Sequence, residues 1–485
     1  MAGIASTGRL LLAGGLVVDG TGAAPRRADV LVEDDRIAAV GAPGTLSAER
    51  TMDIGGRVVA PGFIDSHTHD DGYLLAHPDM TPKVSQGITT VVTGNCGISL
   101  APLVREQLPQ PLDLLGPPSL FRFPTFGAWM QALRASPAAV NVIPLVGHTT
   151  LRVAAMADTQ RAASQEEIER MQDLLDEALD AGAFGMSTGT FYPPAAHAPT
   201  EEIIQVGQPM RERGGLYATH LRDEADRIVP AMEEALEIGR ALDCLVVFSH
   251  HKLAGGRNHG RSAETLALLD RAARLQPVCL DCHPYPATST MLRLDRVRIA
   301  SRTLITWSSG DPQAEGRDFA DIQRELGLDD EQTLARLSPA GAIYFLMDPK
   351  DVERIITHPL GMVGSDGLPF DRHPHPRQWG TFTNVLRTLV RERGVLSLEA
   401  AVHKMTGLAA RHYGVGDRGL VAPGLKADLV VFDPQHVTDR ATFEQPIQAS
   451  HGMERVFVNG QCVWDGLRPT GATPGEVLQR GAHHG

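Results

Sequence analysis

The sequence contains few cysteines, no long apolar run and no excess of positive charge. Its five cysteines are scattered along 485 residues, which excludes a disulfide framework and favours a reducing, cytoplasmic setting. No stretch approaches the ~20 apolar residues of a membrane span. The N-terminal segment has neither the cationic start nor the continuous apolar core of a signal peptide. We therefore expect a cytoplasmic protein without a membrane partner.

The charge balance restricts the partners further. The formal net charge is −13, whereas a general nucleic-acid or anionic-membrane partner requires a basic face. Any anionic substrate must therefore be bound by local lysines and arginines. With 42% hydrophobic and 21% charged residues the composition is that of a globular protein. A chain of 485 residues exceeds one ordinary core, which predicts a large domain with smaller appendages.

What the sequence does contain is a series of metal-ligand residues, each directly after a short apolar stretch of strand character. In the segment GFIDSHTHDD two histidines alternate, and alternate residues of a strand point to the same side. A lone His-x-His is more often structural, but five such elements in succession predict a metal centre, and zinc accepts nitrogen, sulfur and oxygen ligands. The candidate ligands are His67, His69, Cys96, His220, His250 and Asp366.

The middle of the chain alternates strand and helix patterns. Helical patterns such as QEEIERMQDLLDEALDAG separate the strand candidates. Eight alternations predict a (β/α)₈ barrel, an α/β fold whose chemistry sits at the carboxyl ends of the strands, where all the candidate ligands fall. The strand candidates are GFIDS, TTVVTG, NVIPLVG, AFGMST, LYATH, LVVFSH, PVCLDCH and GMVGSD.

The two ends of the chain share a different sequence pattern, in which short strands are separated by glycine turns. They predict one small β-sandwich built from both ends. The gap between the seventh and eighth strands is far longer than a usual loop and predicts an inserted subdomain or lid. We expect the sandwich in residues 1–60 and 416–485, the metal-dependent barrel in residues 61–415, and the insertion in residues 286–345.

The strings APGFIDSHTHDD, SQGITTVVTGNCGIS, GHTTLR, GMSTG, THLRDEAD, SHHK, GSDGLP and HPRQWGTF resemble the amidohydrolase superfamily, and within it the N-acyl-D-amino-acid deacylases. The resemblance covers nearly the whole chain. Many amidohydrolases carry a bridging carboxylated lysine, whereas this family uses a cysteine from the second strand, matched here by Cys96. Asp65 shares the strand face of the His-x-His pair but lies deeper, so we interpret it as a supporting or structural residue.

The resemblance implies two zinc positions. Cys96, His220 and His250 hold the tightly bound ion. A weaker position lies among His67, His69 and Asp366.

The resemblance also implies zinc-dependent hydrolysis of small N-acyl-D-amino acids to a carboxylate and a free D-amino acid. Bound zinc activates water and polarises the acyl carbonyl. Asp366 is the candidate general base and later returns the proton to the departing amine. In an alternative reading Cys96 is itself the nucleophile, but a thiolate bound to zinc is a poor attacker.

Substrate-binding residues are implied by the same resemblance. Lys252 and Arg377 correspond to positions that bind the α-carboxylate, with Ser289 as a hydrogen-bond donor. His283 departs from the family, in which a tyrosine usually precedes the Pro-Tyr pair, so the binding mode of the carboxylate stays open. Arg296 falls where the N-acyl-D-glutamate deacylase branch carries an arginine for the distal carboxylate, and several strings look closest to that branch. The arginines of MLRLDRVR fit a solvated face of the insertion equally well.

Two other functions remain alternatives. A cyclic-amide hydrolase of the dihydroorotase or hydantoinase type is disfavoured because strand four lacks the lysine and Cys96 is present. A non-catalytic amidohydrolase-fold scaffold is disfavoured because all the ligands are present.

Overall fold

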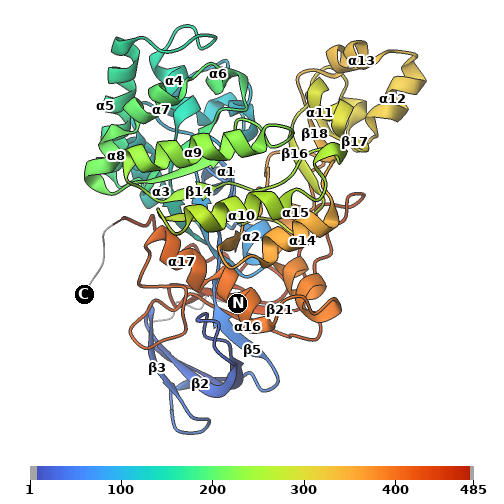
Figure 1. Cartoon of the computed structure of the whole chain (residues 1–485). Helices are drawn as coiled ribbons and strands as arrows, with labels where there is room; N and C mark the ends of the chain where they lie inside the picture. The colour runs from blue at the N-terminus through green and yellow to red at the C-terminus, as the bar shows by residue number, and fades with distance from the viewer. Residues whose placement is uncertain (1–7, 481–485) are drawn as a thin grey trace.

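The computed structural model describes residues 8–480, and its central feature is a closed barrel of parallel strands (Figure 1). Each strand pairs in parallel with its neighbour in chain order. The ring closes where the Ser66 N–H donates to the Val363 carbonyl and Thr68 bridges Gly367. The predicted (β/α)₈ barrel is therefore confirmed. Its strands are β6 (Phe63–Asp65), β7 (Ile88–Thr93), β10 (Asn141–Pro144) continued by β11 (Val146–Gly147), β12 (Gly185–Gly189), β13 (Leu216–His220), β14 (Val246–Phe248), β15 (Val278–Cys282) and β19 (Gly361–Val363).

Amphipathic helices cover the outside of the barrel. In α5 (Gln165–Ala181), the capping box of Ser164 and Glu167 satisfies the first turn, and Gly182 ends the helix in a left-handed conformation. Its apolar face is buried against the barrel wall. Other covering helices are α3 (Phe126–Ala135), α9 (Ile228–Leu242), α10 (Ser262–Ala272), α14 (Pro349–Thr357) and α16 (Leu398–Met405). None of the helices within residues 8–480 combines the length and apolarity needed to cross a membrane.

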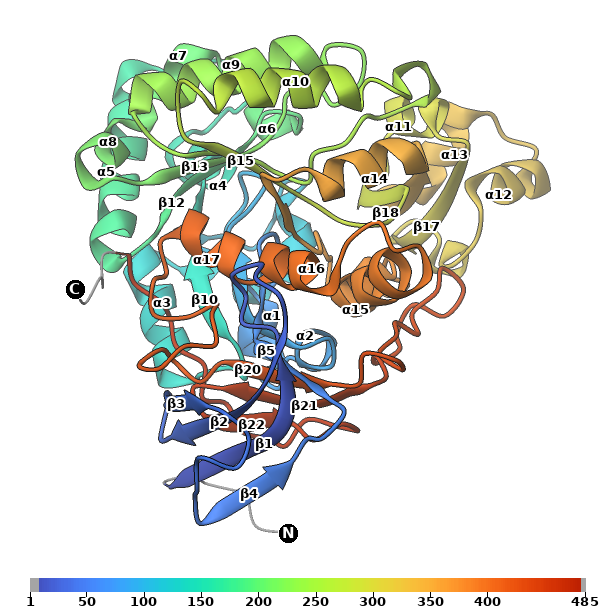
Figure 2. The same cartoon turned by 60° about the horizontal axis from the view of Figure 1, so that its bottom comes forward.

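Both ends of the chain meet in one β-sheet below the barrel, as Figure 2 shows for the blue and red strands. The sheet has eight strands in the order β22-β21-β20-β5-β1-β2-β3, with β4 beside β1. Antiparallel pairing of β20 with β5 joins the two ends, which confirms that both ends build the predicted small β-sandwich region; its strands are connected in one sheet. Residues 1–7 and 481–485 lie outside the described part. The strands are β1 (Arg9–Val17), β2 (Arg26–Glu33), β3 (Arg36–Gly41), β4 (Arg50–Asp53), β5 (Val58–Pro61), β20 (Leu429–Phe432), β21 (Met453–Val458) and β22 (Gln461–Trp464).

An inserted unit lies between β15 and β19, as the length of that gap predicts. It projects beside the barrel in Figure 1 and contains an antiparallel sheet in the order β16-β18-β17. A separate apolar cluster that includes Ile305, Phe319 and Leu337 forms its core. Its elements are β16 (Ala287–Met291), α11 (Leu294–Ile299), β17 (Arg302–Ser308), α12 (Phe319–Leu326), α13 (Asp330–Leu337) and β18 (Ala340–Phe345).

Candidate metal centre

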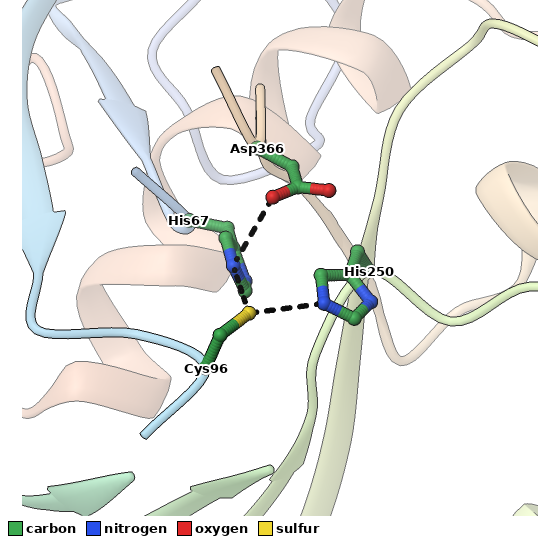
Figure 3. Close-up of side chains that lie close together, drawn as sticks. All are labelled: His67, Cys96, His250 and Asp366. Carbon is green, nitrogen blue, oxygen red and sulfur yellow. Dashed lines mark hydrogen bonds and ion pairs between the residues drawn. The ribbon is translucent and has the colours of Figure 1, made fainter. Parts of the chain in front are cut away.

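Four of the predicted ligands converge at the carboxyl ends of the strands (Figure 3). The ligand atoms of His67, Cys96, His250 and Asp366 all lie within 4.8 Å of one another, and all four residues are buried. The Cys96 sulfur lies 3.3 Å from His67 Nε2 and 3.1 Å from His250 Nε2. Oδ1 of Asp366 lies 3.6 Å from His67 Nε2. The cluster therefore brings a thiol, two imidazoles and a carboxylate to one point.

The other two predicted ligands lie beside this cluster. Nε2 of His69 lies 3.3 Å from Asp366 Oδ1. The ring of His220 packs edge-on against His250, with centroids 4.5 Å apart. Residues His69, His220, His250 and Asp366 all line one cavity. The structure thus brings all six predicted ligands to one site.

The backbone is strained at three of these ligands. Seven described non-glycine residues have a positive φ, and three of the seven are candidate ligands: Cys96 at 53°, His250 at 36° and Asp366 at 51°. Left-handed backbone is unfavourable for residues with a side chain and persists where the surrounding structure imposes it. Such strain at the ends of three barrel strands is typical of a functional site.

Hydrogen bonds with Ser187 on β12 and with Asp71 hold the loop that carries Cys96. The Gly97 N–H donates to Ser187 Oγ at 2.9 Å, and the Ser187 hydroxyl donates to the Gly94 carbonyl. Asp71 accepts from the Gly94 N–H at 3.2 Å. A Cβ at residue 97 would lie 2.5 Å from a backbone nitrogen of β12, so only glycine fits. Ser187 stands on strand four and fixes the turn on both sides of the cysteine.

Ser187→Ala is expected to weaken metal binding about tenfold, because supporting hydrogen bonds around a ligand are worth that much in metal affinity. The unfolding free energy should fall by about 1–3 kcal/mol, since buried backbone groups lose a partner. Chelator competition and urea unfolding measure the two effects. The matched control Ser338→Ala removes a hydroxyl bonded to a helix carbonyl in the insertion and should leave metal affinity unchanged. A Ser187→Ala protein with wild-type metal affinity would contradict this role.

Asp281, at the end of β15, is a site residue that the sequence did not reveal. Its Oδ1 accepts from the His250 N–H at 2.8 Å and lies 3.3 Å from His67 Nδ1. Burial raises the pKa of Asp281 to about 7. A carboxylate on the far nitrogen of a ligand histidine fixes the ring orientation and tautomer. Its position at a strand end was the available signal in the sequence.

Glu224 is a second residue that the sequence did not reveal, although it lies in the segment THLRDEAD. It is buried and follows His220 by four residues. Its carboxylate contacts two candidate ligands and two candidate substrate cations.

A fully buried lysine joins the strand of His67 to the loop of Asp366. Nζ of Lys83 lies 3.0 Å from Asp65 Oδ2 and 3.0 Å from Ser365 Oγ. Asp65 Oδ1 accepts from the Ser365 N–H at 2.7 Å. Asp65, interpreted as a supporting residue, therefore connects the first and last strands of the barrel directly below the cluster.

The predicted substrate-binding residues divide into two groups. Lys252, Ser289 and Arg296 line the cavity above the cluster. Arg377, the first residue of α15 (Arg377–Asn384), is fully buried. Its NH1 lies 2.9 Å from Asp366 Oδ2 and donates to the Thr288 hydroxyl, and its NH2 donates to a backbone carbonyl.

His283 belongs with Arg377. Its Nε2 lies 3.1 Å from Arg377 NH1. Burial and the arginine charge hold the pKa of His283 well below its ordinary value. A neutral imidazole therefore accepts from the guanidinium and helps to hold Arg377 against Asp366.

Burial favours the neutral form of three candidate ligand imidazoles by lowering the pKa of His67, His220 and His250. It lowers the pKa of His67 to about 3 and that of His220 well below its ordinary value. Burial, together with Asp366, raises the pKa of the Cys96 thiol well above its ordinary value, so a thiolate there requires an adjacent cation. Within the described part of the chain, neither ring nitrogen of His220 nor Nδ1 of His69 has a hydrogen-bond partner. This donor set fits a divalent ion such as zinc.

A (β/α)₈ barrel with this donor set at its strand ends has the architecture of a metal-dependent barrel enzyme. A profile of the Amidohydrolase family matches residues 50–464, and the chain belongs to that family.

Three members of the family are similar to this chain over nearly its whole length. The N-acyl-D-aspartate deacylase of Alcaligenes xylosoxydans xylosoxydans is 69% identical over 97% of this chain and 95% of its own length. A solved D-aminoacylase is 56% identical with a TM-score of 0.96, and the match covers 97% of this chain and 99% of that one. That D-aminoacylase has a binuclear metal centre in which one metal activates the enzyme and the second attenuates it. The N-acyl-D-glutamate deacylase of Bordetella bronchiseptica, solved with zinc and a phosphonate mimic of the tetrahedral intermediate, is 47% identical with a TM-score of 0.93, covering 98% and 100%.

These identities confirm the N-acyl-D-amino-acid deacylase group. They also place the chain nearer to the aspartate-named relative, at 69%, than to the glutamate-named structure, at 47%. The sequence strings predict the greatest similarity to the glutamate branch, whereas the chain is more similar to the aspartate-named relative.

Proposed function

We propose that the protein is a zinc-dependent deacylase that hydrolyses N-acyl-D-amino acids to a carboxylate and a free D-amino acid. The observation that carries this proposal is the cluster of His67, Cys96, His250 and Asp366 at a cavity lined by two cations. The 69% identical relative and the zinc-containing structure, both named as deacylases of acidic N-acyl-D-amino acids, support it.

Cys96, His220 and His250 would hold the tightly bound zinc, and His67, His69 and Asp366 would surround a weaker position. When bound, zinc supplies Lewis-acid activation of the acyl carbonyl and of the attacking water.

Asp366 moves the proton in this mechanism. Arg377 binds Oδ2, so Oδ1 is the oxygen that faces His69 and the cluster. Burial raises the pKa of Asp366, but Arg377 and the surrounding histidines together outweigh burial, and the pKa ends well below its ordinary value. The carboxylate is therefore ionised at neutral pH. It accepts a proton from the attacking water at Oδ1 and delivers it to the departing amine nitrogen.

The two cations of the cavity would each bind a different carboxylate of the substrate. Lys252, with Ser289 beside it in the cavity lining, would bind the α-carboxylate, and Arg296 would bind a carboxylate on the D-side chain. Arg377 and His283 would support the site through Asp366. An acidic D-amino acid is therefore the proposed substrate class, with aspartate favoured over glutamate by the identities.

Arg296→Ala is expected to lower kcat/KM for N-acetyl-D-aspartate by a factor equivalent to about 2–5 kcal/mol, the value of one buried charge-assisted contact. N-acetyl-D-leucine should change little because it never uses the contact. The matched control is Arg293→Ala, since both guanidiniums lie 4.4 Å from the Phe191 ring but Arg293 pairs with Asp295 outside the cavity. Equal losses on the two substrates would make Arg296 a structural residue of the insertion.

Parallel assays test the proposed activity against the alternatives. N-acetyl-D-amino acids should be hydrolysed, whereas hydantoins should not, and a scaffold would turn over neither. A reducing, cytoplasmic compartment is part of the proposal, supported by the five unpaired cysteines.

A further inference from the structure

Glu224 occupies a position between the metal ligands and the substrate cations. It follows β13, and its side chain is only 6% exposed. Oε1 lies 2.6 Å from Lys252 Nζ and 3.2 Å from His250 Nδ1. Oε2 lies 3.4 Å from Arg296 NH2 and 3.6 Å from His220 Nε2. One carboxylate therefore touches two proposed zinc ligands and both cations of the cavity.

Lys252 and Glu224 both contact Nδ1 of His250. Lys252 Nζ lies 2.6 Å from His250 Nδ1, and Glu224 Oε1 lies 3.2 Å from that atom. An ammonium group only donates, so this contact requires a lone pair on Nδ1 and places the ring proton on Nε2. A carboxylate only accepts, so the alternative contact requires the proton on Nδ1.

The tautomer decides whether His250 can bind a metal. Its Nε2 is the atom that faces Cys96, with 3.1 Å to the sulfur. A metal bound there needs the lone pair of Nε2 and therefore a proton on Nδ1. Donation from Nδ1 to Glu224 satisfies this requirement, whereas donation from Lys252 to Nδ1 prevents it.

We propose that Glu224 is a positioning residue that couples zinc binding at His250 to the release of Lys252 for the substrate. When Nδ1 donates to Glu224, Lys252 loses its acceptor on His250 and its ammonium is available to a carboxylate in the cavity. Glu224 keeps Lys252 and Arg296 beside the cavity through its two oxygens. This inference rests on the proposed function, since it takes His250 as a zinc ligand and Lys252 as the α-carboxylate site.

A double-mutant cycle on zinc affinity tests the coupling without measuring activity. Chelator competition is measured for the wild type, Glu224→Gln, Lys252→Met and the double variant. Glu224→Gln should weaken zinc binding about 10- to 100-fold. Lys252→Met should bind zinc at least as tightly as the wild type, because the competing ammonium is gone. The double variant should return to within a few-fold of Lys252→Met.

The cycle separates this coupling from a general charge effect. If Glu224 acted only through its negative charge, the two substitutions would contribute additively, and additive effects would overturn the proposal. Unchanged zinc affinity in Glu224→Gln would overturn it as well. If Glu224→Gln does not fold, Lys252→Met decides alone, since weaker zinc binding in that variant contradicts the competition.

Two controls complete the experiment. Glu234→Gln removes a carboxylate that pairs with Arg222 away from the cluster, and it should leave zinc affinity unchanged. Wild-type activity on N-acetyl-D-aspartate is measured alongside. Inactivity of the wild type would reject the proposed function, whereas an active wild type with additive variants would reject only the role of Glu224.

Discussion

Replacing Cys96 with alanine is expected to abolish both stoichiometric zinc and activity. The sulfur lies between His67 Nε2 and His250 Nε2, and it is the only donor in this cluster that can offer a thiolate. Without it, the site retains neutral imidazoles and one carboxylate already paired with Arg377. Metal activation is worth several kcal/mol, and ~4 kcal/mol corresponds to about 10³-fold in rate. We therefore expect kcat to fall at least about 10³-fold.

Metal analysis and kinetics on three variants measure this effect. Cys244→Ala removes a buried thiol away from the cluster and should keep both zinc and activity. His67→Asn should weaken activity with less loss of tightly bound zinc, because we propose that His67 belongs to the weaker position. Equal zinc loss in the Cys96 and His67 variants would contradict the division into strong and weak positions.

Asp366→Asn is expected to retain the tightly bound zinc and to lose nearly all turnover. The change is close to isosteric, but an amide cannot accept the proton of the attacking water. A positioned general base contributes about 10²- to 10⁴-fold, so kcat should fall by that factor. Zinc content and kcat of the purified variant test the prediction directly.

A matched control is available in another buried aspartate. Asp351 accepts hydrogen bonds from the Ser262 backbone and hydroxyl outside the cavity. Asp351→Asn should reduce stability and leave kcat unchanged. An Asp366→Asn enzyme within a few-fold of the wild-type kcat would remove Asp366 from the proton-transfer role.

The barrel and the convergence of its candidate ligands were predictable because both depend on local patterns. Strand stretches followed closely by His67, Cys96 or Asp366 are visible in the sequence, and the rule that barrel chemistry sits at strand ends places these residues together. The alternation of strand and helix patterns likewise defines the eight strands.

The supporting residues were not predictable because their partners are distant in the chain. Ser187 acts on a loop about 90 residues earlier, and Lys83 reaches Ser365 across 282 positions. Asp281 and Glu224 can be recognised as supporting residues only from their contacts with the histidine rings and, for Glu224, with the cavity cations.

Arg377 illustrates a different limit of sequence reasoning. Its family position suggests contact with the substrate, and the structure adds a contact of the buried guanidinium with Asp366. Sequence patterns specify that an arginine is present but not the direction of its guanidinium. The tertiary packing of His283 and α15 determines that direction.

Stereospecific, zinc-dependent hydrolysis is the central claim, and one assay tests it most directly. Purified protein is assayed on N-acetyl-D-aspartate and N-acetyl-L-aspartate, before and after zinc removal by a chelator and again after zinc is restored. We predict rapid hydrolysis of the D-enantiomer only, because inverting Cα cannot keep the α-carboxylate on Lys252 while presenting the amide to the metal cluster. Activity should disappear with zinc and return with it. Equal rates on the two enantiomers, or activity that survives zinc removal, would contradict the account.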